Sequence, residues 1–280
     1  MKSLIINNTN ISFESPLVMG ILNLTPDSFF DGGKYLNKWQ IKDRIDVILN
    51  ENADIIDIGA YSSRPGADHI GEEEELKRLI PAITIIREHY PNAVISIDTF
   101  RASVVEKIYN EYGEFIVNDI SGGTMDDKMY ETVAKYNLPY IMMHIKGTPQ
   151  NMQHNPTYDN VVEEVYSFFE PRINALKELG HDKIIIDPGF GFGKTLEHNY
   201  DILRNMDRYK DLGYPILVGV SRKSMICKLL GCNPPKALTG TIAINTLALD
   251  KGADILRVHD VREGYETVKI FNAFKKGIID

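Results

Sequence analysis

Short apolar runs alternate with longer amphipathic stretches along almost the whole chain. Several runs, among them I-I-D-I-G, V-I-S-I-D and Y-I-M-M-H, are nearly continuously apolar, which is typical of parallel strands buried on both faces. The stretches between them place apolar residues at helical spacing, most clearly at 38–52, 72–90, 159–179 and 236–251. The runs begin near Leu17, Asp54, Ala93, Phe115, Pro139, Lys183, Pro215 and Asp254.

Eight strand–helix units within 280 residues predict a (β/α)8 TIM barrel. A doubly wound open sheet is the alternative, and the count of eight favours the barrel. No linker or shift in composition marks a second domain, so we expect one domain over residues 1–280. A short β-hairpin is predicted at residues 3–14, around the turn N-N-T-N. We expect this N-terminal hairpin, within residues 1–15, to plug the bottom of the barrel.

Composition narrows the class of protein without identifying it. Hydrophobic residues make up 43% and charged residues 25%, as in an ordinary globular protein. The formal charge of −8 argues against nucleic acid or an anionic membrane as a partner. Apolar runs are too short for a signal peptide or a membrane span, so we expect a cytoplasmic location. Cys227 and Cys232 are interpreted as an incidental reduced pair, and no spacing fits a zinc site.

Every predicted strand ends in polar residues, and the carboxyl ends of the strands form the active-site face of such a barrel. A single polar residue there is often only a helix cap. Polar residues at all eight ends favour a ligand that has both a polar heterocycle and an anionic group. In chain order these residues are Asn23, Asp57, Asp98, Asn118 with Asp119, His144, Asp187, Ser221 to Lys223, and Arg257 with His259.

The loop after Asn23 combines polar residues with two aromatic ones. It contains Thr25, Asp27, Phe29 and Asp31, with Phe30 beside Phe29. Because a solvated connection has little use for two phenylalanines, we interpret this loop as a lid that closes over a planar ligand.

Arg257 and His259 stand at i and i+2 on the last predicted strand, so both side chains leave the same face. A guanidinium beside an imidazole favours an anion site, and phosphate is a frequent ligand of such sites. A buried ion pair of the arginine with a carboxylate is the structural alternative.

The segment D-P-G-F-G-F-G-K-T resembles a nucleotide-binding loop only superficially. A P-loop requires a glycine five residues before Gly193, where this chain has Pro188. We interpret the glycines as a sharp turn that leaves Phe192 to stack on a flat ligand. Lys223 is predicted at the start of a helix, where the dipole disfavours a cation, so its presence suggests contact with a ligand carbonyl.

Taken together, these segments resemble the dihydropteroate synthases, a family of pterin-binding barrels. The motifs are G-I-L-N-L-T-P-D-S-F, S-R-P-G-A, S-I-D-T-F, N-D-I-S-G-G, D-P-G-F-G-F-G-K, S-R-K-S and R-V-H, in order over the whole chain. The resemblance implies a magnesium-dependent transferase of folate biosynthesis. Such an enzyme joins (7,8-dihydropterin-6-yl)methyl diphosphate to 4-aminobenzoate, giving 7,8-dihydropteroate and diphosphate.

The resemblance also implies roles for individual residues. The catalytic residues would be Asp98, Asp187, Lys223, Arg257 and His259. The pterin would contact Asp98, Asn118, Ile120, Met143, Asp187, Phe192, Gly219 and Lys223. The aminobenzoate would contact Phe29, Ser63, Arg64, Pro65 and Ser224. The diphosphate would contact Asn23, Ser63, Arg257 and His259, with Asn23 also a magnesium ligand. The lid would contain Thr25, Asp27, Phe29 and Asp31.

Further expectations follow from the same resemblance. The displacement of diphosphate is expected to be dissociative, the protein to be a homodimer, and sulfonamides to compete with 4-aminobenzoate. The sequence departs from many family members at Ser63, where threonine is frequent, and at Phe30, where a small polar residue is frequent. Three rival readings are a methyltetrahydrofolate:corrinoid methyltransferase, a non-catalytic pterin-binding protein and a sugar-phosphate enzyme. The Arg257–His259 pair argues against the methyltransferase, which needs no diphosphate site.

Overall fold

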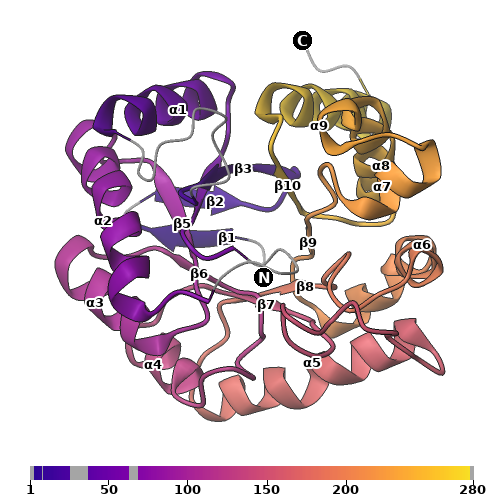
Figure 1. Ribbon diagram of the computed structural model, residues 1–280, viewed down its shortest axis with the longest axis horizontal. Helices are drawn as coiled ribbons and strands as arrows, with labels where there is room; N and C mark the ends of the chain where they lie inside the picture. The colour runs from indigo at the N-terminus through magenta and orange to yellow at the C-terminus, as the bar shows by residue number, and fades with distance from the viewer. Residues whose placement is uncertain (1–2, 8, 26–36, 63–68, 278–280) are drawn as a thin grey trace.

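A computed structural model describes residues 3–7, 9–25, 37–62 and 69–277 of the chain. Eight parallel strands form the wall of a barrel with helices around it, as Figure 1 shows in a view along the barrel axis. In chain order the strands are β3 (Leu17–Asn23), β4 (Ile55–Gly59), β5 (Val94–Asp98), β6 (Ile116–Asp119), β7 (Tyr140–Met143), β8 (Ile184–Asp187), β9 (Leu217–Val218) and β10 (Ile255–Val258).

The strand order closes the sheet on itself. The first barrel strand, β3, pairs with β4 on one side and with the last strand, β10, on the other. The remaining seam, between β8 and β9, is joined by a parallel bridge from Ile186 to Ile216, and the Ile186 N–H donates to the Pro215 carbonyl at 2.9 Å. An open sheet would leave these edges apart, so the predicted barrel is confirmed.

Helices follow the strands and cover the outside of the barrel (Figure 1). They are α1 (Lys38–Asn50), α2 (Glu72–His89), α3 (Ala102–Tyr112), α4 (Met129–Lys135), α5 (Val161–Glu178), α6 (Leu196–Arg204), α7 (Ser224–Leu230), α8 (Leu238–Asp250) and α9 (Val261–Lys276), with the 3-10 helices η2 (Met206–Leu212) and η3 (Pro234–Lys236). Within the described ranges, no helix is both long and apolar enough to cross a membrane.

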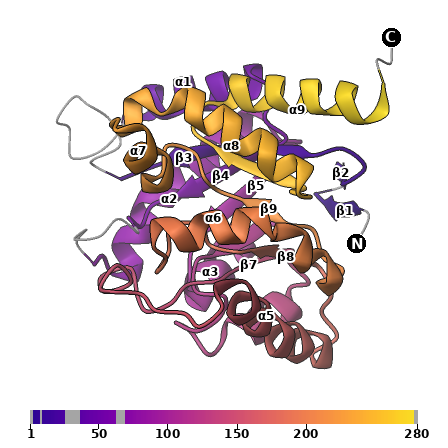
Figure 2. The same cartoon turned by 90° about the vertical axis from the view of Figure 1, so that its right-hand side faces the viewer.

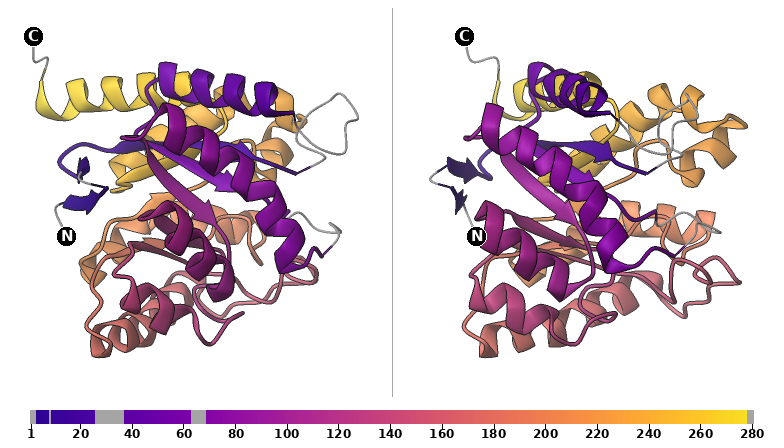
Figure 3. Two further views of the ribbon diagram at one scale, coloured as in Figure 1. Left: turned by 90° about the vertical axis from the view of Figure 1, so that its left-hand side faces the viewer. Right: turned by 60° about the vertical axis from the view of Figure 1, so that its left-hand side comes forward.

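The N-terminal hairpin, β1 (Ser3–Ile6) paired with β2 (Thr9–Ser12), lies at the amino end of the barrel strands (Figures 2 and 3). Leu4, Ile6 and Ile11 are buried, and they form one apolar cluster with the first residues of the barrel strands. Asn7 fastens the hairpin turn, because its N–H donates to a Glu114 carboxylate oxygen at 2.8 Å. The predicted plug is therefore confirmed.

Strand register sets the height of the polar residues at the other end. Asn23 pairs with Gly59, Gly59 with Asp98, and Asp98 with Asn118, so all four residues lie at one level at or next to the ends of their strands. Gly59 leaves open space there, because its missing side chain would point between Asn23 Oδ1 and Asp98 Oδ2, at 3.5 and 3.6 Å.

Two element boundaries differ from the sequence expectation. The seventh barrel strand pairs only over Leu217–Val218, although its apolar run begins near Pro215. The helix expected from residue 236 begins two residues later, as α8, because Lys236 still belongs to η3, a separate tight turn that starts with Pro234 and Pro235.

Candidate active site

The centre of the barrel mouth is a buried ion-pair network. Arg257 on β10 donates from Nε to Asp57 Oδ2 at 2.7 Å, and its Nη2 lies 2.6 Å from the same oxygen. Nη2 also donates to Asp98 Oδ2 at 3.1 Å. The second oxygen of Asp57 accepts the amide N–H of Asn118 at 3.1 Å. One fully buried carboxylate therefore orients both Arg257 and Asn118.

Burial and neighbouring charges shift the pKa values of Asp98 and Arg257 in this network. Burial raises the pKa of Asp98 to about 7, against the opposing effect of the Arg257 guanidinium. Burial lowers the pKa of Arg257, but Asp57 and Asp98 more than offset that effect and raise it. Arg257 therefore stays charged, while Asp98 gains or loses a proton near neutral pH. The buried ion pair considered for this arginine exists, with Asp57 and Asp98 as its partners.

A second group of polar residues faces the network from β8 and the loop after β9. Asp187 Oδ1 accepts the Gly189 N–H at 2.8 Å, and burial raises the pKa of this carboxyl against the opposing charge of Lys223. Lys223 donates to the Phe190 carbonyl, and its Nζ lies 4.5 Å from the centroid of the Phe192 ring. Burial lowers the pKa of Lys223 to about 8. Lys223 is the N-cap of α7, as the sequence predicted.

The apolar wall expected from the sequence is a distinct cluster at the same end of the barrel. Ile120 and Met143 are buried in it, and Phe192 packs against it. The other members are Tyr61, Phe100, Ile145 and Met152, with Ile70 also packed against them. Gly219 lies beside Arg257, since an added Cβ would stand 3.8 Å from Arg257 Cδ. Aromatic and apolar groups thus stand beside hydrogen-bonding ones, as a planar heterocycle requires.

His259 lies at the edge of the network next to Ser221. Its backbone N–H donates to Ser221 Oγ at 3.2 Å, and its Nδ1 lies 3.0 Å from the same oxygen. Because that hydroxyl already accepts the backbone N–H, we assign its proton to a bond toward Nδ1, which leaves Nε2–H as the outward donor. Burial, together with the charges of Arg257 and Arg222, lowers the pKa of His259 to about 4. The imidazole is therefore neutral at pH 7.

Most of the predicted site residues come together at one end of the barrel. Asn23 and Thr25 lie at the end of β3, and Ser224 is exposed at the start of α7. Asp27, Phe29, Asp31, Ser63, Arg64 and Pro65 lie outside the described residues. Asp57, expected at a strand end, lies in the middle of β4, and the sequence signal for its place in the network is a lone carboxylate in the apolar run I-I-D-I-G.

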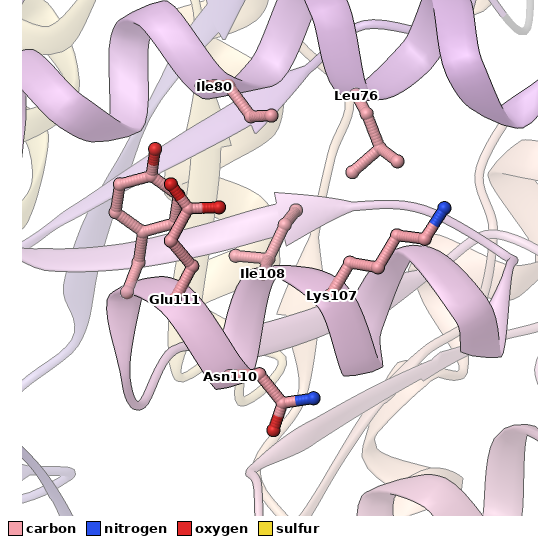
Figure 4. A pocket seen from close by; sticks show the side chains of 7 residues that line it. Leu76, Ile80, Lys107, Ile108, Asn110 and Glu111 are labelled. Carbon is pink, nitrogen blue, oxygen red and sulfur yellow. The ribbon is translucent and has the colours of Figure 1, made fainter.

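Other places in the described part of the chain offer weaker candidates. No group of three or more His, Cys, Asp or Glu residues there is arranged to hold a metal ion. A surface hollow between α2 and α3 is lined by Leu76, Ile80 and Ile108 with a few polar side chains (Figure 4). Because both helices lie outside the barrel wall, this hollow does not belong to the strand-end site.

Comparison with known proteins identifies the family. Residues 19–259 match the family model described as pterin binding enzyme. The dihydropteroate synthase of Haemophilus influenzae is 40% identical over 269 residues, which cover 95% of this chain and 97% of that protein. A crystal structure of Yersinia pestis dihydropteroate synthase with a sulfonamide drug complex superposes with a TM-score of 0.92 at 37% identity, covering 99% and 100% of the two chains. A Xanthomonas albilineans dihydropteroate synthase structure with 4-aminobenzoic acid gives 0.90 at 35%, covering 99% of each chain. The chain therefore belongs to the pterin-binding enzymes and, among them, to the dihydropteroate synthase family.

Proposed function

We propose that the barrel mouth joins (7,8-dihydropterin-6-yl)methyl diphosphate to 4-aminobenzoate. One arrangement of side chains supports this proposal. Groups suited to a pterin edge, Asn118, Asp187 and Lys223, face the same opening as the donors suited to a diphosphate, Arg257 and His259. The family membership and the 4-aminobenzoic acid in the Xanthomonas albilineans structure support both substrates.

The pterin is expected to bind at the deep side of the site. A carboxylate accepts paired N–H donors, so Asp187 fits the amino and ring N–H groups of a pterin, while the Lys223 ammonium fits its carbonyl. Asn118 adds a directional contact, because Asp57 fixes its amide at 3.1 Å. Ile120, Met143 and Phe192 supply the apolar faces, and Gly219 leaves room beside Arg257.

The proposed reaction breaks the C–O bond to diphosphate and forms a C–N bond to the aminobenzoate nitrogen, which loses one proton. The arylamine is neutral at pH 7 and needs no strong base, so departure of the diphosphate is the demanding step. Arg257 and the Nε2–H of His259 would stabilise the leaving oxygens. Ionised Asp98 and Asp187 would stabilise positive charge on the methylene, which favours a dissociative displacement. An isotope effect that shows concerted bond formation would contradict this order of events.

Magnesium is proposed to bind together with the diphosphate. Asn23 Oδ1 is an oxygen donor at the rim, and Asp98 Oδ2 faces the same space above Gly59. Mg²⁺ typically uses few protein oxygens, keeps several waters and relies on substrate phosphates, so this sparse set of donors fits it. When bound, the ion would neutralise charge on the leaving group. Calorimetry should detect magnesium binding with inorganic pyrophosphate present and much weaker binding without it.

The remaining substrate contacts are proposals carried by the family resemblance. Ser224 stands at the exposed end of the site, at the start of α7, where an aminobenzoate carboxylate would reach it. Phe29, Ser63, Arg64 and Pro65 are proposed as its other contacts, and Thr25, Asp27, Phe29 and Asp31 as the lid. Because sulfonamides mimic 4-aminobenzoate, we expect them to inhibit competitively against it.

A turnover assay tests the proposal directly. The purified protein is mixed with the pterin diphosphate, magnesium and labelled 4-aminobenzoate, and dihydropteroate is separated by chromatography. The proposal requires labelled product and release of pyrophosphate. Pterin binding without product would favour the non-catalytic rival, and methyl transfer from methyltetrahydrofolate to a corrinoid would favour the methyltransferase rival.

A matched variant tests the diphosphate site. Arg257→Ala should weaken binding of the pterin diphosphate far more than binding of 6-hydroxymethylpterin, which carries no phosphate. Equal losses for both ligands would contradict the diphosphate role. Lys128→Ala removes an exposed cation from the start of α4 and should leave both affinities unchanged.

We also propose a cytoplasmic homodimer that pairs through the outer helices α7, α8 and α9, which lie together in Figure 1. These helices expose large apolar side chains, which on a monomer would be a liability. They are Leu229 (60% exposed), Leu230 (55%), Leu247 (53%), Ile270 (71%) and Phe274 (76%). Light scattering should give twice the 31.7 kDa chain mass. Phe274→Glu should weaken the dimer, and Leu179→Glu at the end of α5 should not.

A further inference from the structure

Lys194 is a buried lysine for which the proposed reaction has no direct use. The residue is 3% exposed. Its Nζ lies 2.8 Å from His144 Nδ1, 2.9 Å from the Gly189 carbonyl oxygen and 3.0 Å from the Phe192 carbonyl oxygen. The three contacts satisfy the three N–H donors of an ammonium, but none of these partners carries a negative charge.

A positive charge on Lys194 lowers the stability of the folded protein. Burial lowers the pKa of Lys194 well below its usual value, and although the Asp187 carboxylate raises it, the Lys223 ammonium lowers it further. Burying a charge without a paired counter-charge generally costs more than burying an apolar side chain of the same size. A methionine would fill the volume, so packing alone does not account for a lysine.

Lys194 holds the turn at residues 189–192, which contacts the proposed pterin-binding residues Asp187 and Lys223. Its two carbonyl contacts bracket the turn at Gly189 and Phe192, whose own N–H donates back to the Gly189 carbonyl at 3.1 Å. The Gly189 N–H donates to Asp187. Lys223 donates to the Phe190 carbonyl and lies over the Phe192 ring. Any movement of the turn would therefore displace Asp187 and Lys223 relative to each other.

The turn is fixed against β7 as well. Gly189 has φ +70°, and an added Cβ would lie 1.9 Å from the His144 carbonyl oxygen, so the two backbones touch. His144 itself is buried at the end of β7, with its ring 4.9 Å from the Phe168 ring. Lys194 thus bridges the buried end of β7 and the turn after β8.

We infer that Lys194 is a positioning residue for the pterin: seated on His144, it fixes the 189–192 turn and supplies a positive charge behind Asp187. This inference rests on the proposed function. The lysine is not expected to touch substrate. Its charge favours the ionised form of Asp187, in agreement with its contribution to lowering the pKa of that carboxyl.

The test compares Lys194→Met and Lys194→Gln with the parent protein and with Lys128→Met, which removes an exposed charge elsewhere. Binding of 6-hydroxymethylpterin is measured by calorimetry from pH 5 to 9, and unfolding by urea. Lys194→Met should weaken pterin binding at neutral pH by about tenfold or more, as expected for lost hydrogen bonds to a charged group. It should also move the acid limb of the binding profile to higher pH, because Asp187 would then take up a proton more readily.

The two variants distinguish the effect of the Lys194 charge from the effect of its hydrogen bonds. Lys194→Gln retains N–H donors for the two carbonyls without the charge, so it should move the acid limb as well, with a smaller loss of affinity at high pH. Urea unfolding of Lys194→Met should occur at the parent's midpoint or above it. Weaker binding with an unmoved acid limb in both variants, or parental binding by Lys194→Met, would overturn the inference. Lack of pterin binding by the parent protein would overturn the proposed function and this inference together.

Discussion

Asp57 is the residue whose replacement tests the site network most severely. It is fully buried, and its two oxygens accept from Asn118 at 3.1 Å and from Arg257 at 2.7 and 2.6 Å. In Asp57→Asn one of these oxygens becomes an NH2 group, which must face a donor in either orientation of the amide. The variant has nearly the same volume, so the change isolates charge and hydrogen bonding.

The expected size of the effect follows from these contacts. Breaking a buried ion pair by removing one partner costs about 3–5 kcal/mol of unfolding free energy. Asp98 still lies 3.1 Å from Arg257 Nη2, so we expect the lower end, about 3 kcal/mol. At roughly 2–4 °C per kcal/mol for a chain near this size, the melting temperature should fall by about 6–12 °C. Pterin affinity should also fall, because Asn118 loses the acceptor that orients its amide.

A double-mutant cycle with Arg257→Met provides the decisive assay, with unfolding by urea at pH 7.5. The two substitutions remove the same contacts, so the double variant should lose less stability than the sum of the single ones, by at least about 1 kcal/mol. Additivity within about 0.5 kcal/mol would refute the coupling. An unfolding free energy of Asp57→Asn within that margin of the parent would refute the reasoning from burial.

Four further outcomes are expected. Because the pKa of Lys223 is lowered to about 8, kcat/KM for the pterin should fall as pH rises through that value, and Lys223→Arg should abolish this alkaline limb in a pH–rate profile. Gly191→Ala should reduce pterin affinity in calorimetry, since Gly191 has φ +82° and the new Cβ would stand 3.3 Å from Lys223 Cδ. Tyr140→Phe should destabilise the protein by about 1–3 kcal/mol in urea unfolding, because buried Asp119 loses a 2.7 Å hydrogen bond. If residues 1–280 form one domain, fluorescence and circular dichroism should report the same melting midpoint, and two midpoints would contradict a single domain.

The fold was predictable because its signals are local and repeated. Apolar runs such as I-I-D-I-G mark doubly buried strands, and eight of them leave few arrangements. The polar strand ends were predictable for the same reason, since every parallel strand presents its carboxyl end to one face. The two boundary differences, at Pro215 and Pro234, lie where proline interrupts pairing or helical hydrogen bonding.

The contacts within the site were not predictable in this way, because they depend on which distant strands become neighbours. Asp57 and Arg257 are 200 positions apart in the chain, and only closure of the barrel brings them together. The protonation state of His259 could not be predicted from the sequence either. Burial, Arg257 and Arg222 together lower its pKa to about 4, and the spacing of residues in the sequence does not reveal this burial. The sequence suggested an anion site made of a guanidinium and an imidazole, and in the structure these two groups are one permanent cation and one neutral donor.

The N-terminal hairpin limits the side from which substrates can reach the site. Leu4, Ile6 and Ile11 cover the amino end of the barrel, where they pack against the first residues of the barrel strands. Asn118 and Asp187 lie buried in its depth, whereas Ser224 lies exposed at its rim. If the pterin binds in that depth as proposed, we expect it to enter before an aminobenzoate bound above it, and the joined product to leave before the next pterin arrives. The hairpin leaves the strand-end face as the expected route for both steps.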